Sequence, residues 1–359
     1  MKRFTNLLSL TLTVLAIAAV AIVGCEGPAG QAGADGTNGT NGTNGTNGTD
    51  GVDGNGTCVQ CHDESTEIYV KRLQAANSKH LTGGDFERSD ADCAGCHTHE
   101  GFLERMEAGN FYSSAAVANP SPQNCRTCHN IHINYDSTDF AIRYPDPVKL
   151  AFNDVTVDMS EGNVCANCHQ PNLLNPTYEI GGDSISITNK RWGPHHGPQS
   201  AMVHGTTGYE VAGTVTYPEP GSSMHAGAGC TKCHMPDAFG NQAGGHTLNM
   251  TYLYHGHDED WVSGCTDCHS GIEDFDLNGK KTLVAELTDS LHHMLITEGL
   301  VDSSGYLKAS SSAPLKVSPE QAGLIYNFKF VEEDLSEGVH NTKYAVALLQ
   351  NSIEALSAN

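Results

Sequence analysis

The sequence contains few of the residues that build a large hydrophobic core. Hydrophobic residues make up 38% of the 359 positions and aromatic residues 7%, with only two tryptophans, whereas glycine is abundant at 39 residues. Length alone would suggest two or three ordinary domains, each with its own core, and this composition is thin for such an arrangement. The shortage indicates that something other than side chains supplies part of the core.

Basic residues are also scarce. The chain has 19 Lys and Arg against 42 Asp and Glu, which gives a formal net charge of −23. Binding to nucleic acid needs a basic surface that neutralises phosphates, so we expect no nucleic-acid partner. The charge favours metal cations and cationic electron donors as partners, although an acidic surface also serves solubility alone.

One pentapeptide, Cys-x-x-Cys-His, occurs six times. Its first cysteines are Cys58, Cys93, Cys125, Cys165, Cys230 and Cys265. Its second cysteines are Cys61, Cys96, Cys128, Cys168, Cys233 and Cys268. Its histidines are His62, His97, His129, His169, His234 and His269. Two thiols at this spacing can add to the two vinyl groups of one porphyrin, and the following histidine can then reach the iron as its proximal ligand. The sequence therefore predicts six covalently bound haem c groups.

Paired cysteines alone would also suit six disulfides or four-thiolate zinc sites. Neither explains why histidine, which is 19 of 359 residues, follows every pair, since that coincidence has odds on the order of one in ten million or less. Six buried macrocycles would also supply the apolar surface that the composition lacks. We therefore expect mostly loops and short α-helices wrapped around a haem chain, with little β-structure.

The N-terminus has the pattern of an export signal, with Lys2 and Arg3 followed by an apolar run over residues 7–23. The run ends in Ile-Val-Gly-Cys, which resembles the lipobox of bacterial lipoproteins, in which the cysteine becomes the acylated first residue. That cysteine, Cys25, is the thirteenth and lies outside the six motifs, so lipidation accounts for it better than a stray thiol. In enteric bacteria, an Asp directly after the lipidated cysteine retains a lipoprotein in the inner membrane. Glu26 stands at that position here, so by resemblance to this rule the outer membrane or cell surface is favoured. The alternative is an ordinary cleaved signal with Cys25 incidental.

Glycine occupies every third position from residue 27 to residue 54. This is the period of collagen, but Pro28 is the only proline in the segment, so a flexible tether is favoured over a triple helix. We accordingly expect a lipoprotein signal peptide over 1–24, a lipidated N-terminus and collagen-like stalk over 25–56, and a hexahaem domain over 57–276. Residues 277–359 would form a C-terminal helical cap.

The predicted cap carries helical signals and no cysteine. Leucine recurs every four residues from 283 to 295, and Gly299 then offers a stop. Ser318 is followed by Pro and, at the third position, by Gln321, a capping pattern that predicts a helix through about residue 333. A last helix is expected from Asn341 through Ile353.

The second axial ligand of each iron decides the chemistry, because an iron with two histidines cannot bind substrate whereas an open position can. Thirteen histidines remain beyond the six in the motifs, and six of these stand out by context. The predicted distal ligands are His80, His132, His195, His225, His246 and His340. His132 lies three residues after His129, too close to serve the same iron and therefore suited to a neighbouring haem.

Other histidines compete with members of this set. His196 could serve in place of His195, and His292 or His293, both within a predicted helix, could displace a member. No motif has lysine in place of its histidine, which argues against an active site like that of nitrite reductase. A catalytic haem with an empty distal side stays open as an alternative.

These features resemble the outer-surface multihaem c-type cytochromes of metal-reducing bacteria, in particular the hexahaem, OmcS-like nanowire group. The residues that carry the resemblance are the six motifs and the segments 93–102, 128–132 and 193–199. The resemblance implies a wire of haems stacked in alternating parallel and perpendicular pairs, with close porphyrin edges. A lipobox and a glycine-repeat stalk, however, suit a surface-tethered monomer better than a filament subunit.

The sequence thus predicts an extracellular electron-transfer protein that receives electrons from an outer-membrane conduit or other multihaem cytochromes. Its acceptors would be metal oxides, soluble molecules, filaments or partner cells, and we expect a carrier more than an enzyme, with terminal metal reduction left open. One alternative is a multihaem reductase of a nitrogen or sulfur oxyanion, which needs one haem without a sixth ligand. The other is a subunit of a polymeric nanowire, which would show a deficit of distal ligands within one chain.

Overall fold

The computed structural model describes residues 58, 61–63 and 67–358, all of which belong to one compact unit, Val52–Asn359. The predicted signal peptide, the lipidation site Cys25 and the glycine-repeat stalk lie outside the described residues. No helix in the described part of the chain has both the length and the apolar character needed to cross a membrane.

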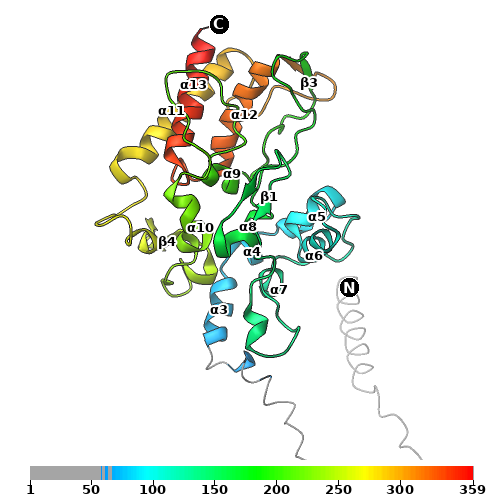
Figure 1. Cartoon of the computed structure of the whole chain (residues 1–359), viewed down its shortest axis with the longest axis vertical. Coiled ribbons are helices and arrows are strands. Elements are labelled where there is room, and N and C mark those ends of the chain that lie inside the picture. The colour runs from blue at the N-terminus through cyan, green and yellow to red at the C-terminus, as the bar shows by residue number, and fades with distance from the viewer. Residues whose placement is uncertain (1–57, 59–60, 64–66, 359) are drawn as a thin grey trace, which may run out of the picture. The chain divides into compact units, whose positions relative to one another are not determined.

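Short helices and long loops make up the part of the fold that carries the motifs (Figure 1). The α-helices here are α3 (Glu67–Ala75), α4 (Lys79–Thr82), α5 (Ala91–His97), α6 (His99–Ala108), α7 (Cys125–Cys128), α8 (Asn163–Ala166), α9 (Gln199–His204) and α10 (Met224–His234). The 3-10 helices are η1 (Asp85–Glu87), η2 (Ser137–Phe140), η3 (Ser160–Gly162), η4 (Gly245–Thr247), η5 (Ser263–Cys265) and η6 (Leu277–Gly279). Four of these α-helices, α5, α7, α8 and α10, contain motif cysteines.

Strands are few and short, as the sequence predicts. They form three antiparallel pairs, β1 (Val148–Lys149) with β2 (Thr156–Val157), β3 (Ile185–Ile187) with β6 (Leu315–Val317), and β4 (Thr251–Tyr254) with β5 (His257–Asp260). The β4–β5 hairpin turns through His255 and Gly256, both at positive φ, which suits a tight two-residue turn. The β3–β6 pair aligns Ile185 with Val317 and so fastens a long loop to the C-terminal helices.

The three long helices are α11 (Lys280–Thr297), α12 (Pro319–Asp334) and α13 (Thr342–Ser357), and they confirm the predicted helical C-terminus. At the start of α12, Ser318 Oγ accepts from the Gln321 N–H at 3.1 Å while Gln321 Oε1 accepts from the Ser318 N–H at 3.1 Å. Asn341 caps α13 by accepting from the Tyr344 N–H at 3.2 Å. These capping bonds satisfy N–H groups that the helices leave without partners.

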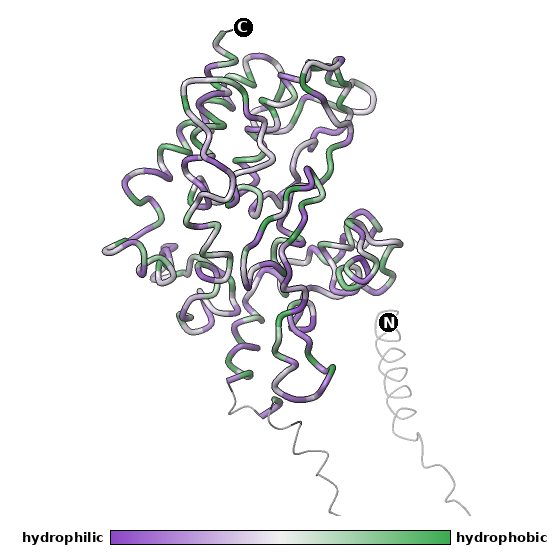
Figure 2. The backbone as a smooth tube through the Cα atoms, in the orientation of Figure 1, coloured by the Kyte–Doolittle hydropathy of each residue, from purple (hydrophilic) through white to green (hydrophobic). Residues whose placement is uncertain are grey.

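The apolar core gathers around α12, which is buried along nearly its whole length. Tyr326 stacks on Phe330 with ring centroids 5.8 Å apart, and Phe330 meets Tyr344 of α13 edge-on at 6.4 Å. Leu291 and Leu295 of α11 are fully buried in the same cluster. Green, apolar stretches of the tube in Figure 2 run through these helices. Each such buried side chain contributes about 1.5–3 kcal/mol, so side-chain packing stabilises this region.

Candidate haem-binding sites

A connected cavity of about 3960 Å³ runs through the part of the fold that carries the motifs. Its lining includes both cysteines and the histidine of all six motifs, and also the six histidines predicted as distal ligands. Pockets for one small molecule usually hold about 300–1,000 Å³, so this cavity has room for several large planar groups. The part of the core that side chains do not fill is thus a space lined by the motifs.

Each motif histidine lies beside one histidine ring from elsewhere in the chain, and the spacing is nearly constant. The ring centroids are separated by 6.1 Å in His62–His132, 6.0 Å in His169–His80, 6.3 Å in His97–His195, 6.2 Å in His129–His246, 6.3 Å in His234–His340 and 6.1 Å in His269–His225. Two imidazoles on opposite sides of one metal ion, with bonds of about 2 Å and ring centres about 1.1 Å further out, have centroids about 6.2 Å apart. The ring pairs therefore fit an iron between them.

Several of these rings are held through their second nitrogen. Nδ1 lies 2.7 Å from the Phe140 carbonyl oxygen in His129, 3.1 Å from Gln199 Oε1 in His169, 3.2 Å from the Leu248 carbonyl in His234, 2.9 Å from the Val339 carbonyl in His225 and 2.7 Å from Asp334 Oδ1 in His340. These oxygens only accept, so Nδ1 carries the proton and Nε2 keeps its lone pair for a metal.

Serine caps position two of the predicted distal histidines. Ser78 Oγ accepts from the Leu81 N–H at 3.4 Å and so starts α4, which carries His80. Ser223 Oγ accepts from the N–H of His225 at 3.2 Å at the start of α10. In each case the cap fixes the first turn of the helix, and the histidine lies in that turn.

A buried carboxylate shapes the loop that carries His132. The Asp139 carboxylate accepts from the backbone N–H groups of His132 and Asn134 at 2.7 Å each and of Tyr135 at 3.1 Å. Burial opposes the charge, but these backbone donors hold the pKa of Asp139 below its usual value. The loop is thereby fixed with His132 at φ 66, where its ring stacks on Tyr135 at 5.5 Å.

The two neighbouring histidines after Pro194 take different directions. Glu333 of α12 accepts a hydrogen bond from the backbone N–H of His196 and lies 3.4 Å from its Nδ1. Nζ of Lys329 lies 3.1 Å from the same carboxylate. Burial disfavours the charged form of this lysine, but the carboxylates of Glu332 and Glu333 raise its pKa. His196 is drawn toward α12, and His195 is the residue that lies beside His97.

The competing histidines have other partners. His292 stacks on Phe328 with centroids 4.8 Å apart, and its Nε2 lies 3.0 Å from the Asp302 carbonyl oxygen. His99, which lies outside the predicted ligand set, is buried, and its Nδ1 lies 2.9 Å from the hydroxyl oxygen of Thr127 in the third motif. Neither ring is paired with a motif histidine, so the alternative that His292 displaces a distal ligand gains no support.

The motif segments are joined to one another directly. Arg105, only 2% exposed, donates from Nε to the Gly95 carbonyl at 2.7 Å and from Nη2 to the Asn167 carbonyl at 2.7 Å. Gly95 lies in the second motif and Asn167 in the fourth. One buried guanidinium therefore ties two sites together, and charged donors of this kind make stronger hydrogen bonds than neutral ones.

Other sites share a single segment of chain. Helix α10 contains the whole fifth motif and also His225, whose ring lies beside that of the sixth motif. Lys232 in the fifth motif forms an ion pair with Asp267 in the sixth. The segment 129–132 likewise supplies one ring to each of two pairs. Neighbouring sites are thus held close by continuous backbone.

The two competing uses of paired cysteines find no support in the described residues. The cysteines of the second to sixth motifs are unbridged thiols. No group of three or more His, Cys, Asp or Glu in this part of the chain is arranged as a metal-ion site.

Two curated proteins are similar in sequence, while no protein-family model matches. Both are the C-type polyheme cytochrome OmcB of Geobacter sulfurreducens, from strains DL-1/KN400 and ATCC 51573/PCA. Each is 26% identical over 229 residues, which cover 59% of this chain and 27% of OmcB. The chain thus spans about a quarter of the length of the curated relatives that it matches.

Two solved structures are also similar. The outer cell wall cytochrome OcwA matches with a TM-score of 0.45 and 21% identity over 80% of this chain and 50% of OcwA. The undecaheme cytochrome from the S-layer of Carboxydothermus ferrireducens matches with a TM-score of 0.44 and 16% identity, over 79% and 40% of the two chains. The match to OmcB supports the broad class and says nothing for the narrower OmcS-like group. Together with the six motifs, this match makes the chain similar to multihaem c-type cytochromes.

Proposed function

We propose that the chain binds six haem c groups, each through the two cysteines and the histidine of one motif and through a second histidine from elsewhere in the chain. The observation that carries this proposal is the set of six ring pairs at 6.0–6.3 Å. A constant spacing across six pairs, whose two rings come from different parts of the chain, has a simple cause if one iron lies within each pair.

Bound haem c with two histidine ligands supplies one-electron chemistry at an iron that has no free position. The residues of the chain attach the haem groups, orient their ligands and set their spacing. Motif thiols fix each porphyrin in place, and carbonyl acceptors such as those of Phe140 and Val339 orient the imidazoles. Arg105 and helix α10 keep successive sites adjacent. Such an arrangement suits a relay and not a substrate-binding centre.

We therefore infer that the protein carries electrons on the outer surface, from an outer-membrane conduit or another multihaem cytochrome to extracellular acceptors such as metal oxides, filaments or partner cells. The export signal and the lipid anchor at Cys25 that the sequence predicts favour this location, and the collagen-like stalk predicted over residues 25–56 would serve as a tether. The net charge of −23 suits cationic donors and metal acceptors.

The ring pairs also weigh against the two alternatives. A reductase of nitrogen or sulfur oxyanions needs an iron with an open face, whereas all six motif histidines have a partner ring. A filament subunit that borrows a ligand from the next copy would leave one motif histidine without a partner in its own chain. Because each pair is completed within one chain, the relay is favoured.

The relay proposal is tested by stoichiometry and by ligand binding. Intact mass and a reductive titration should give six haems and six electrons per chain, with ferric iron reoxidising the reduced protein. Carbon monoxide should leave the reduced spectrum unchanged, because no iron has a free position. A carbon monoxide adduct together with turnover of nitrite or sulfite would replace the relay with a reductase.

A further inference from the structure

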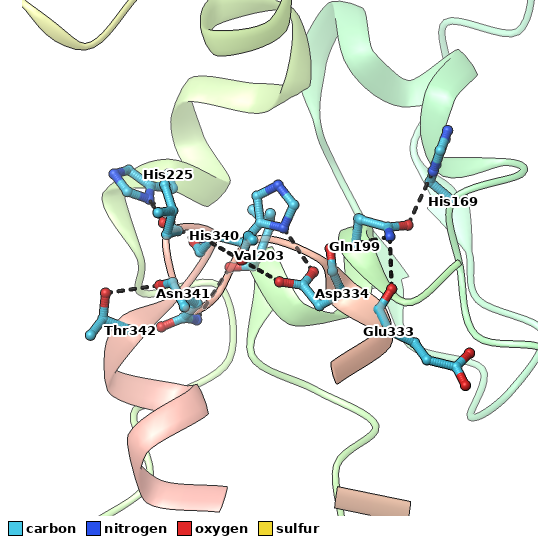
Figure 3. Close-up of polar contacts among 12 residues, drawn as sticks. His169, Gln199, Val203, His225, Glu333, Asp334, His340, Asn341 and Thr342 are labelled. Carbon is cyan, nitrogen blue, oxygen red and sulfur yellow. Dashed lines mark hydrogen bonds and ion pairs between the residues drawn. The ribbon is translucent and has the colours of Figure 1, made fainter. Parts of the chain in front are cut away.

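The ring of His340 is bonded to a carboxylate. Asp334, the last residue of α12, is only 1% exposed, and its Oδ1 lies 2.7 Å from Nδ1 of His340 (Figure 3). Ser336 donates its hydroxyl proton to Oδ2 of the same carboxylate, and its Oγ accepts from the His340 N–H at 3.2 Å. The three residues form a closed hydrogen-bonded ring that fixes both the carboxylate and the imidazole.

This contact distinguishes one site from the others. His129, His169, His225 and His234 donate from Nδ1 to neutral oxygens, namely backbone carbonyls or the Gln199 side-chain amide. In Figure 3, Gln199 lies between His169 and α12, whereas the Asp334 carboxylate points at His340. Among the twelve paired rings in the described part of the chain, no other is bonded to a carboxylate.

The negative charge on Asp334 is not balanced by a basic side chain. The neighbouring Glu333 is held by Lys329 at 3.1 Å, and Glu337 by Lys281 at 3.1 Å on the surface. Within the described residues, Asp334 forms no ion pair with lysine or arginine. A buried charge in a medium of low dielectric constant acts strongly on its neighbours, and His340 is the titratable side chain that this carboxylate contacts.

A carboxylate behind an axial imidazole makes the ligand more basic and places negative charge near the metal. Both effects favour the ferric state, which carries one more positive charge than the ferrous state, and so lower the reduction potential. The opposite ligand, His234, bonds only to the neutral Leu248 carbonyl at 3.2 Å. Asp334 alone therefore sets this site apart.

We propose that Asp334 is a positioning residue that gives the haem of the fifth motif the lowest reduction potential of the six. The inference rests on the proposed function, since it assumes that His234 and His340 ligate one iron. The fifth motif lies between the fourth, through Cys230 Sγ at 3.9 Å from the Gly162 carbonyl beside α8, and the sixth, through the Lys232–Asp267 ion pair. The haem that is reduced last would thus adjoin the sites of the fourth and the sixth motifs.

The test is a redox titration of the holoprotein and of Asp334→Asn, resolved into one-electron components. Asparagine keeps an acceptor oxygen at the same place and removes the charge. We expect the reduction potential of the most negative component to rise by about 59 mV, which for one electron is a tenfold change in the reduction equilibrium. All six haems should stay low-spin. Glu337→Gln removes a solvent-exposed charge three residues away and should move no component comparably.

A second variant should shift the same reduction potential in the opposite direction. Ser336→Ala removes the hydroxyl that neutralises part of the carboxylate, so the same component should become more negative. The inference is overturned if neither variant moves the most negative component, if both move it in one direction, or if Asp334→Asn yields a high-spin haem, since Asp334 would then only hold the ring. A wild-type protein with fewer than six components contradicts the proposed function instead.

Discussion

The ring of His97 lies 6.3 Å from the ring of His195, while the adjacent His196 bonds to Glu333. This contrast offers a matched pair of variants. His195→Ala should leave one iron without its distal ligand and produce a high-spin electron paramagnetic resonance signal from about one haem in six. His196→Ala should leave the spectrum low-spin. If His196→Ala gives the high-spin signal and His195→Ala does not, the assignment of this pair is wrong.

Gly338 should tolerate no side chain, because it approaches α11 closely just before His340. Its φ is +89, and an added Cβ would lie 2.6 Å from Cγ2 of the buried Val284. Left-handed strain and overpacking each cost about 1–3 kcal/mol, so Gly338→Ala should lower the free energy of unfolding by about 2 kcal/mol or more. Gly299→Ala, at φ +74 with open space around it, is the control and should cost only the strain. Equal losses in guanidinium unfolding would show that the contact with Val284 does not matter.

Arg105 should be essential for stability although it lies outside every motif. Its guanidinium serves carbonyl groups of Gly95, Asn167 and Phe111 in a buried setting. Arg105→Met would leave these acceptors without donors, at about 1–3 kcal/mol for a buried unsatisfied group. The exposed Arg126 provides a control, and Arg126→Met should unfold at nearly the wild-type guanidinium concentration. Similar midpoints for the two variants would contradict this role.

The sequence was sufficient to predict the regular C-terminal elements. The capping pattern at Ser318 and Gln321 and the start of the last helix at Asn341 are local signals, and both appear as predicted. The leucine repeat located α11 but not its buried face. A spacing of four drifts away from the helical period of 3.6, so Val284 is fully buried where Leu283 is only partly covered.

The partners of the histidines could not be predicted from their positions in the chain. His80 shortly precedes the second motif but lies beside His169 of the fourth, and His225 precedes the fifth but lies beside His269 of the sixth. Sequence proximity fails here because the loops fold back around the cavity. The orientation of His195 likewise depends on a residue far along the chain in α12, which no local pattern reveals.

Acid should weaken the contact between α13 and the loop at residues 213–215. The Glu354 carboxylate accepts from the Thr214 N–H at 2.8 Å and from its hydroxyl at 2.5 Å, and these hydrogen bonds, with one from Gln350, lower the pKa of Glu354. A carboxyl with a lowered native pKa stabilises the fold above its unfolded pKa, about 4.3, and this stability is lost as pH falls through the native pKa.

Glu354→Gln should therefore unfold at a lower guanidinium concentration than the wild type at pH 7, with the difference shrinking below about pH 4. The exposed Glu298 gives the control, since Glu298→Gln should change the midpoint little at either pH. A difference for Glu354→Gln that persists unchanged in acid would mean that the ionised carboxylate is not its source.

In the proposed relay, six irons are each held by two histidines of one chain. Low-temperature electron paramagnetic resonance of the oxidised full-length protein, with haem content from pyridine haemochrome on the same sample, measures this ligation. We expect six haems per chain, all with low-spin bis-histidine signals. A high-spin signal from any one haem would mean that an iron has an open face, and the protein would then be a candidate reductase in place of a relay.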